Sequence, residues 1–160
     1  MYKNILVPLD GSELAECVLG HVESIANGCG TESVTFLRVV EPVYLAVSAE
    51  PDSGYTFSAR DWQKLEDDLK SAASNYLDRL VARTKYGNVK IKSEVITGKA
   101  ADSIAAYAEE KGIDLITIAT HGRSGVGRWV WGSVADRVLR TAIVPILMIR
   151  PPGCAPPTMA

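Results

Sequence analysis

The chain has 160 residues, of which 47% are hydrophobic and 22% are charged, a composition typical of a globular protein that buries a core. The formal net charge of −2 includes no basic block, which argues against nucleic acid as the main partner because phosphate-backbone binding needs clustered lysine and arginine. No apolar run approaches the roughly 18 residues of a membrane-spanning helix, and three cysteines without metal-ligand spacing favour a reducing, cytoplasmic location.

The first half of the chain predicts two buried strands, each followed by a helix. Both strands are short apolar runs that end at turn signals, and the first is too short to be a signal peptide. Ser12 is the expected N-cap of the first helix, and Gly28–Gly30 is expected to end it. Residues 43–58 are turn-rich and are expected to form a loop. The strands are expected at 4–10 and 33–42, and the second helix at 59–83, with an apolar face of Trp62, Leu65, Leu69, Ala72, Tyr76 and Leu80.

The second half continues the same alternation of strands and helices. Residues 88–96 alternate in polarity and predict a half-exposed strand, whereas the next two strands are more uniformly apolar. These later strands are expected at 113–120 and 144–150, and the helices at 101–112 and 133–141. Residues 1–150 are therefore expected to form a single domain, followed by a Pro-rich and disordered tail at 151–160.

Five strands that alternate with helices predict an α/β fold with a doubly wound parallel sheet covered on both faces. Such sheets commonly have the strand order 3-2-1-4-5, and the direction of winding then reverses between the first and fourth strands. The reversal opens a crevice at the carboxyl ends of these strands, where ligands bind. Two loops flank the crevice: "PLDGS" after the first strand and a glycine-rich segment after the fourth.

The glycine-rich segment, "ATHGRSGVGRWVWGSVAD", has the parts of a phosphate-binding loop. Its glycines, Gly122, Gly125, Gly127 and Gly132, permit positive φ and close approach of the main chain to a ligand. Exposed N–H groups in such turns form an anion-binding nest, and Ser133 begins a helix whose dipole attracts negative charge. The residues alone leave two interpretations open: a phosphate-binding loop, or a turn that is only structural.

Three better-known phosphate loops do not match this segment. A Walker loop needs a lysine after its last glycine, and none is present here. The first three glycines read GxxGxG, whereas the dinucleotide-binding fingerprint is GxGxxG and follows the first strand. The catalytic motifs that accompany a kinase glycine loop are also missing from the sequence.

The segments "ILVPLDGSELAE", "LRVVEP", "GKAADSIAAYAEEKGIDLI" and "GRWVWGSVADRVLR" closely resemble universal stress proteins, and the resemblance covers residues 2–150. It implies a three-layer fold like that of adenine nucleotide alpha hydrolases. The nucleotide-binding branch of the family carries Gly-x2-Gly-x9-Gly-Ser/Thr. In this chain the pattern is Ala119-x2-Gly122-x9-Gly132-Ser133, so that alanine replaces the first glycine.

The resemblance implies a site for ATP or another adenine nucleotide, with Mg²⁺ as a possible companion of the phosphates. The loop from Ala119 to Arg123 would wrap the ribose and phosphates, and Gly132–Val134 would receive the phosphate tail. Asp10 would hydrogen-bond the nucleoside or help to hold Mg²⁺, and a main-chain group of Val39 would read the base edge. The full set implied is Pro8, Leu9, Asp10, Val39, Gly98, Ala119, Thr120, His121, Gly122, Arg123, Gly125, Gly132, Ser133 and Val134.

Several of these side chains also have simpler interpretations. Asp10 could cap the first helix, and His121 is expected to line the ligand or stabilise the turn rather than act as a general base. Arg123 and Arg128 could reach phosphates or face solvent. The two tryptophans at 129 and 131 suit packing or a subunit contact better than base stacking.

The leading hypothesis is a dimeric stress-response protein that acts through adenine-nucleotide occupancy rather than turnover, with no catalytic residues assigned. The last strand, Val144 to Arg150, is an apolar sheet edge, and family members dimerise by pairing this strand. The alternatives are a slow ATP hydrolase or phosphotransferase that uses Asp10, Mg²⁺ and His121, and an interaction module without nucleotide.

Overall fold

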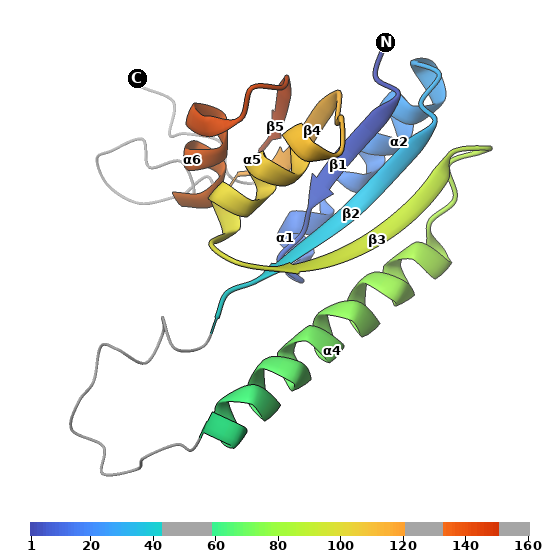
Figure 1. Cartoon of the computed structure of the whole chain (residues 1–160). Helices are drawn as coiled ribbons and strands as arrows, with labels where there is room; N and C mark the ends of the chain where they lie inside the picture. The colour runs from blue at the N-terminus through green and yellow to red at the C-terminus, as the bar shows by residue number, and fades with distance from the viewer. Residues whose placement is uncertain (43–58, 121–132, 151–160) are drawn as a thin grey trace, which may run out of the picture.

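The computed structural model describes residues 1–42, 59–120 and 133–150. At its centre is a five-stranded parallel sheet (Figure 1). The order β3-β2-β1-β4-β5 confirms the predicted winding and its reversal between β1 and β4. The strands are β1 (Asn4–Pro8), β2 (Ser33–Val40), β3 (Lys90–Thr97), β4 (Leu115–Ala119) and β5 (Ile146–Ile149).

Helices cover the sheet on both faces and give the three layers expected (Figure 1). One core cluster joins Phe36 of β2 to Val22 of α2 and Leu77 of α4. The other joins the next residue of β2, Leu37, to Val138 of α6 and to α5. The helices are α1 (Glu13–Glu16), α2 (Leu19–Gly28) and α4 (Ala59–Arg83) on the first face, and α5 (Ala100–Glu110) and α6 (Ser133–Thr141) on the second.

The burial of each strand follows its place in the sheet. Four of the five residues of β1 are buried, as are the first five residues of β2, because helices cover both faces of these central strands. The edge strand β3 alternates between exposed and half-buried residues, which confirms its predicted half-exposed character. Strands β1, β2, β4 and β5 are shorter than the segments that predict them, because residues at the segment ends lie outside the strand ladders.

The expected single helix after β1 is two helices in the structure. The backbone N–H of Cys17 bonds to the carbonyl of Leu14 at 3.3 Å, three residues back, and α2 begins only at Leu19. A bond to the third preceding residue tightens the turn and ends the regular α-helical ladder. Both pieces still bury apolar side chains on the sheet, including Ala15 and Val22.

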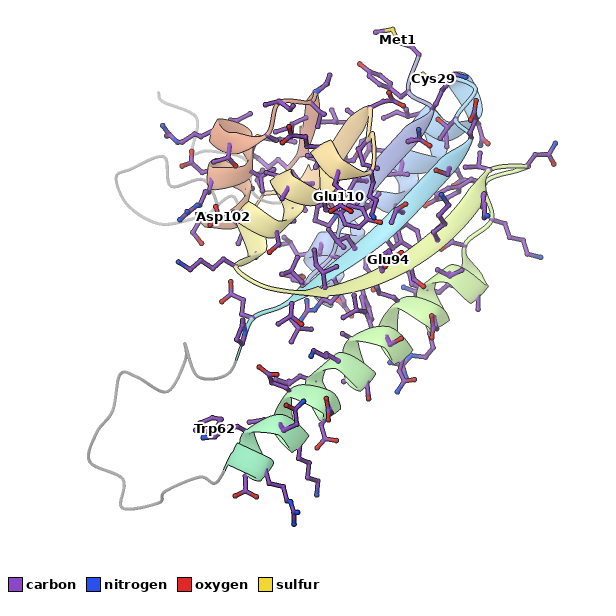
Figure 2. All side chains as sticks on the ribbon, viewed as in Figure 1. Met1, Cys29, Trp62, Glu94, Asp102 and Glu110 are labelled. Carbon is purple, nitrogen blue, oxygen red and sulfur yellow. The ribbon has the colours of Figure 1, made fainter. Side chains whose placement is uncertain are left out.

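The apolar face predicted for α4 is correct only toward its C-terminal end. Leu80 is buried and Tyr76 is half-buried, but Ala73 and Leu77 occupy the sheet-facing positions, and Ala72 is exposed. Toward its N-terminal end α4 diverges from the sheet, and Trp62 lies in this part (Figures 1 and 2). A helix of 25 residues is about 37 Å long, whereas an eight-residue strand spans only about 27 Å. The two other misassigned positions are Leu65 and Leu69, which are 39% and 40% exposed.

Three predicted segments lie outside the described residues: the loop at 43–58, the glycine-rich segment at 121–132 and the tail at 151–160. Among the helices that the structure describes, none combines the length and the apolar composition needed to cross a membrane.

Candidate functional site

The candidate site lies at the carboxyl ends of β1, β2 and β4, where the sheet order places the winding reversal. The described members of the predicted set lie at the ends of these strands, at the turn after β3 and at the start of α6. They are Pro8, Leu9, Asp10, Val39, Gly98, Ala119, Thr120, Ser133 and Val134. The others lie outside the described residues: His121, Gly122, Arg123, Gly125 and Gly132, together with the weighed alternatives Arg128, Trp129 and Trp131.

A set of hydrogen bonds fixes the exposed Asp10 carboxylate in the turn after β1. Asp10 Oδ1 accepts from the Ser12 backbone N–H at 2.9 Å and from the Ser12 hydroxyl at 2.6 Å. Ser12 Oγ in turn accepts from the Ala15 N–H at 3.1 Å, which confirms Ser12 as the N-cap of α1. Asp10 therefore orients the capping residue and does not cap the helix itself.

Arg38 reaches this same turn from β2, although the sequence analysis does not single it out. Its Nη1 donates to the carbonyl of Leu9 at a long 3.4 Å, and the Leu9 N–H donates to the carbonyl of Leu37 at 2.9 Å. The signal in the sequence is a single charged residue inside the apolar run of β2. Such a residue at the carboxyl end of a central strand indicates a polar neighbour at that edge.

The ends of β2 and β3 bring Val39 and Gly98 to the same edge. Val39 is half-buried, and Gly98 continues the ladder through its N–H bond to the carbonyl of Val40 at 3.1 Å. A Cβ at Gly98 would lie too close to the hydroxyl of Ser103, and its φ of +157° is one that other residues rarely adopt, so glycine is favoured there. Glu41 follows β2 and accepts from the N–H of Ala100 at 3.2 Å, a contact that ties this edge to the start of α5 and that the sequence analysis missed.

The end of β4 and the start of α6 supply the remaining described residues. Ala119 is the last residue of β4 and is half-buried. Because β4 is extended backbone, a residue with a Cβ is accommodated at this motif position without strain. Thr120 is buried and its N–H donates to the carbonyl of Ile149 at 2.9 Å. Ser133 and Val134 are exposed at the beginning of α6.

The helix that follows the Asp10 turn, α1, contacts α4 through Glu16. The hydroxyl of Tyr76 donates to Glu16 Oε1 at 3.0 Å, and the guanidinium of Arg83 pairs with the same carboxylate. Burial raises the pKa of the Tyr76 phenol, and its hydrogen bond to the negatively charged Glu16 raises it further, whereas the charge of Arg83 acts in the opposite direction.

This arrangement fits a ligand with hydroxyl groups and an apolar ring better than a bare anion. A carboxylate accepts hydrogen bonds from ribose hydroxyls but repels phosphate oxygens, so Asp10 suits the nucleoside part. Half-buried Val39 offers an apolar surface, and Ser133 offers a hydroxyl at a helix start, where phosphate is favoured. Across the three described ranges, no cluster of three or more His, Cys, Asp or Glu side chains is positioned to hold a metal ion.

Comparisons with known proteins agree on one family. The model of the universal stress protein family matches residues 1–150. Universal stress protein MJ0531 of Methanocaldococcus jannaschii is 30% identical over 152 residues, which cover 95% of this chain and 84% of that protein. The solved structure of MJ0577, from the same organism, has a TM-score of 0.76 and 26% identity, covering 96% of this chain and 99% of that one. A universal stress protein solved in complex with cAMP has a TM-score of 0.62 and 19% identity, covering 93% and 97%.

Proposed function

Because the chain belongs to the universal stress protein family, we propose that it binds an adenine nucleotide, with ATP as the favoured ligand, at the carboxyl edge between β1 and β4. The observation that supports this proposal is the sheet order, which sets the carboxyl ends of β1 and β2, with Asp10 and Val39, beside the winding reversal, together with the Asp10 carboxylate already held by Ser12. The neighbour in complex with cAMP shares only the fold at 19% identity. The proposal therefore rests on residues of this chain.

Each described residue has a role that follows from its chemistry. Asp10 accepts hydrogen bonds from the ribose or from a water of a phosphate-bound Mg²⁺. Pro8, Leu9 and Val39 provide the apolar slot for the base, and Gly98 lies toward the sugar. Ser133 and Val134 receive the phosphates at the start of α6, where backbone N–H groups and the helix dipole favour negative charge. The glycine-rich segment 121–132 completes the loop in the proposal.

We assign the action of the protein to ligand occupancy rather than turnover. A ligand shifts the equilibrium between two conformations only if it binds one of them more tightly. We therefore propose that the bound nucleotide favours the conformation that presents one partner-binding surface. A homodimer through β5 is part of the proposal, supported by 77% exposure of Ile143 beside this edge strand. The three cysteines of the sequence lack metal-ligand spacing, which supports a reducing compartment, for which we propose the cytoplasm.

Equilibrium titration of the purified protein with ATP, AMP and cyclic AMP tests the proposal, with GTP as a base-specificity control. Nucleotide already bound is first identified by denaturing the protein and separating the released compounds by chromatography. We expect Asp10→Ala to weaken adenine-nucleotide binding roughly tenfold, the equivalent of one charge-assisted hydrogen bond. Asp68→Ala, which removes an exposed carboxylate from α4, is the matched control and should leave affinity unchanged. No binding at millimolar ligand would overturn the proposal.

A further inference from the structure

Arg38 is the charged residue of β2, and its setting is unusual for a cation. The five residues before it in the strand are buried, and Arg38 itself is half-buried. Removing a charge from water is costly unless the charge is paired or hydrogen-bonded. The ion pairs that the structure shows among residues 1–42, 59–120 and 133–150 do not include Arg38. Its placement therefore needs another explanation than a salt bridge within that part of the chain.

The contacts of Arg38 are with the main chain of the turn after β1. Its Nη1 donates to the carbonyl of Leu9 at 3.4 Å, while the preceding residue of β2, Leu37, accepts from the Leu9 N–H at 2.9 Å. Consecutive residues of β2 thus hold both polar groups of the Leu9 backbone. Leu9 is the last residue before Asp10, so its peptide plane sets the direction in which Asp10 leaves the sheet.

The same guanidinium also reaches the residue on the other side of Asp10. Gly11 has φ +82°, and a Cβ placed there would lie 3.8 Å from Arg38 Nη1. Nη1, the same atom that donates to the Leu9 carbonyl, therefore lies within van der Waals distance of the space that a side chain at Gly11 would occupy. Asp10 lies between these two residues in the chain. Its carboxylate is held separately, by hydrogen bonds from the N–H and hydroxyl of Ser12.

We propose that Arg38 is a positioning residue of the nucleotide site, which fixes the direction of the Asp10 carboxylate by holding Leu9 and covering Gly11. The inference rests on the proposed function, because Asp10 is taken as the ligand contact. The rigid, planar fork of a guanidinium holds the Leu9 carbonyl in a more defined direction than the flexible ammonium of lysine would. Arg38 acts through Asp10 and needs no contact of its own with the nucleotide.

A double-mutant cycle with ATP titration tests this role. We expect Arg38→Gln to weaken ATP binding roughly tenfold in the wild-type background, the equivalent of one hydrogen bond to a charged group. In the Asp10→Ala background the same substitution should have less than about a twofold effect, because the contact that Arg38 positions is already missing. Arg79→Gln removes an equal charge from an exposed position of α4 and should not change the affinity. If Arg38→Gln reduced the affinity for ATP by the same factor in the wild-type and Asp10→Ala backgrounds, the inference would be overturned.

A second measurement on the ligand-free protein separates this inference from the proposed function. The Ser12 N–H donates to Asp10 Oδ1, so its hydrogen exchange, followed by NMR, reports how firmly Asp10 is held. We expect exchange at Ser12 to be faster in Arg38→Gln and unchanged in Arg79→Gln, with matched urea midpoints as the folding control. Unchanged Ser12 exchange in Arg38→Gln would overturn the inference even if ATP binds. If the wild type binds no nucleotide, the proposed function fails and Ser12 exchange alone decides whether Arg38 positions Asp10.

Discussion

At the scale of single residues, two buried threonines differ in whether their hydroxyl finds a partner. Thr31 is 7% exposed, and its Oγ1 donates to the carbonyl of Tyr2 at 2.7 Å. Thr117 of β4 is fully buried, and its Oγ1 has no hydrogen-bond partner among the described residues. Thr117 lies two residues after Leu115 and therefore faces the same side of the sheet, toward the core cluster under α1, α2 and α4. The Thr117 hydroxyl therefore loses its hydrogen bonds to water on folding and gains none from the described residues, whereas the Thr31 hydroxyl gains one with the carbonyl of Tyr2.

This difference predicts opposite effects of the same substitution. Thr117→Val should stabilise the fold by about 0.5–1.5 kcal/mol, because it replaces an unsatisfied hydroxyl by a methyl group of similar size. Thr31→Val should destabilise it by about 1 kcal/mol, because the carbonyl of Tyr2 loses its donor. Urea unfolding of both variants and the wild type gives the free energies of unfolding. A destabilising Thr117→Val would contradict the assignment and would show that the hydroxyl is hydrogen-bonded in solution.

At the scale of elements, a side-chain pair connects the two helices that cover the second face. Asp102 lies at the start of α5 on the side of α6 (Figure 2). Arg137 of α6 donates to its two carboxylate oxygens at 2.9 and 3.0 Å. The side chains are 58% and 45% exposed, so water screens much of their attraction. Since α6 begins with Ser133, this pair helps to hold the proposed phosphate end of the site against α5.

A double-mutant cycle with Asp102→Ala and Arg137→Ala should give a coupling of about 0.5–1 kcal/mol, the upper range for exposed but bidentate pairs. The coupling should fall markedly in 1 M salt, where the screening length is about 3 Å. Urea unfolding at low and high salt measures it. The pair Asp136–Arg140 lies within α6 and should show a similar salt effect without connecting the helices. A coupling that is independent of salt would show that the Asp102 contact is mainly packing.

Helices and strands could be predicted from the sequence where the hydrophobic pattern and the flanking turn residues agree. Helices 59–83 and 133–141 agree with the structure to the residue, because their apolar spacing and flanking turns are both clear. The break between α1 and α2 was missed because a tightened turn at Cys17 leaves no mark in the hydrophobic pattern. Exposure of Leu65 was missed because it depends on where the sheet stops, which is a tertiary property.

In the candidate site too, some features could be predicted from the sequence and others depend on tertiary structure. The positions of Asp10 and Val39 followed from sheet topology, since strand ends meet wherever parallel strands are neighbours. The contact of Arg38 with Leu9 joins residues 29 apart and depends on how β2 lies against β1. A pattern read along the chain marks Arg38 as unusual but does not reveal its partner.

At the scale of the whole molecule, the two edges of the sheet differ in character. The outer strand β3 exposes Lys90, Lys92 and Glu94, and charges of this kind discourage pairing with another sheet. The other edge, β5, is apolar throughout, and Ile143, three residues before it, is 77% exposed. An apolar and uncharged edge favours pairing with a second copy, so the asymmetry supports the proposed dimer through β5 and not through β3.

The backbone of β5 allows this dimer to be tested without disturbing the sheet. The carbonyls of Pro145 and Ile149 accept from β4 at 3.0 and 2.9 Å, so by the two-residue period of a strand the N–H of Met148 points away from β4. Met148→Pro removes this outward donor, and proline is tolerated at a sheet edge. We expect it to give a monomer in analytical ultracentrifugation, with a loss of stability similar to that of Met148→Ala, because both variants lose a half-buried side chain that packs on the α5 and α6 face. Met148→Ala removes the same side chain but keeps the N–H, so it should remain a dimer. A wild-type monomer, or a Met148→Pro dimer of unchanged affinity, would exclude pairing through β5.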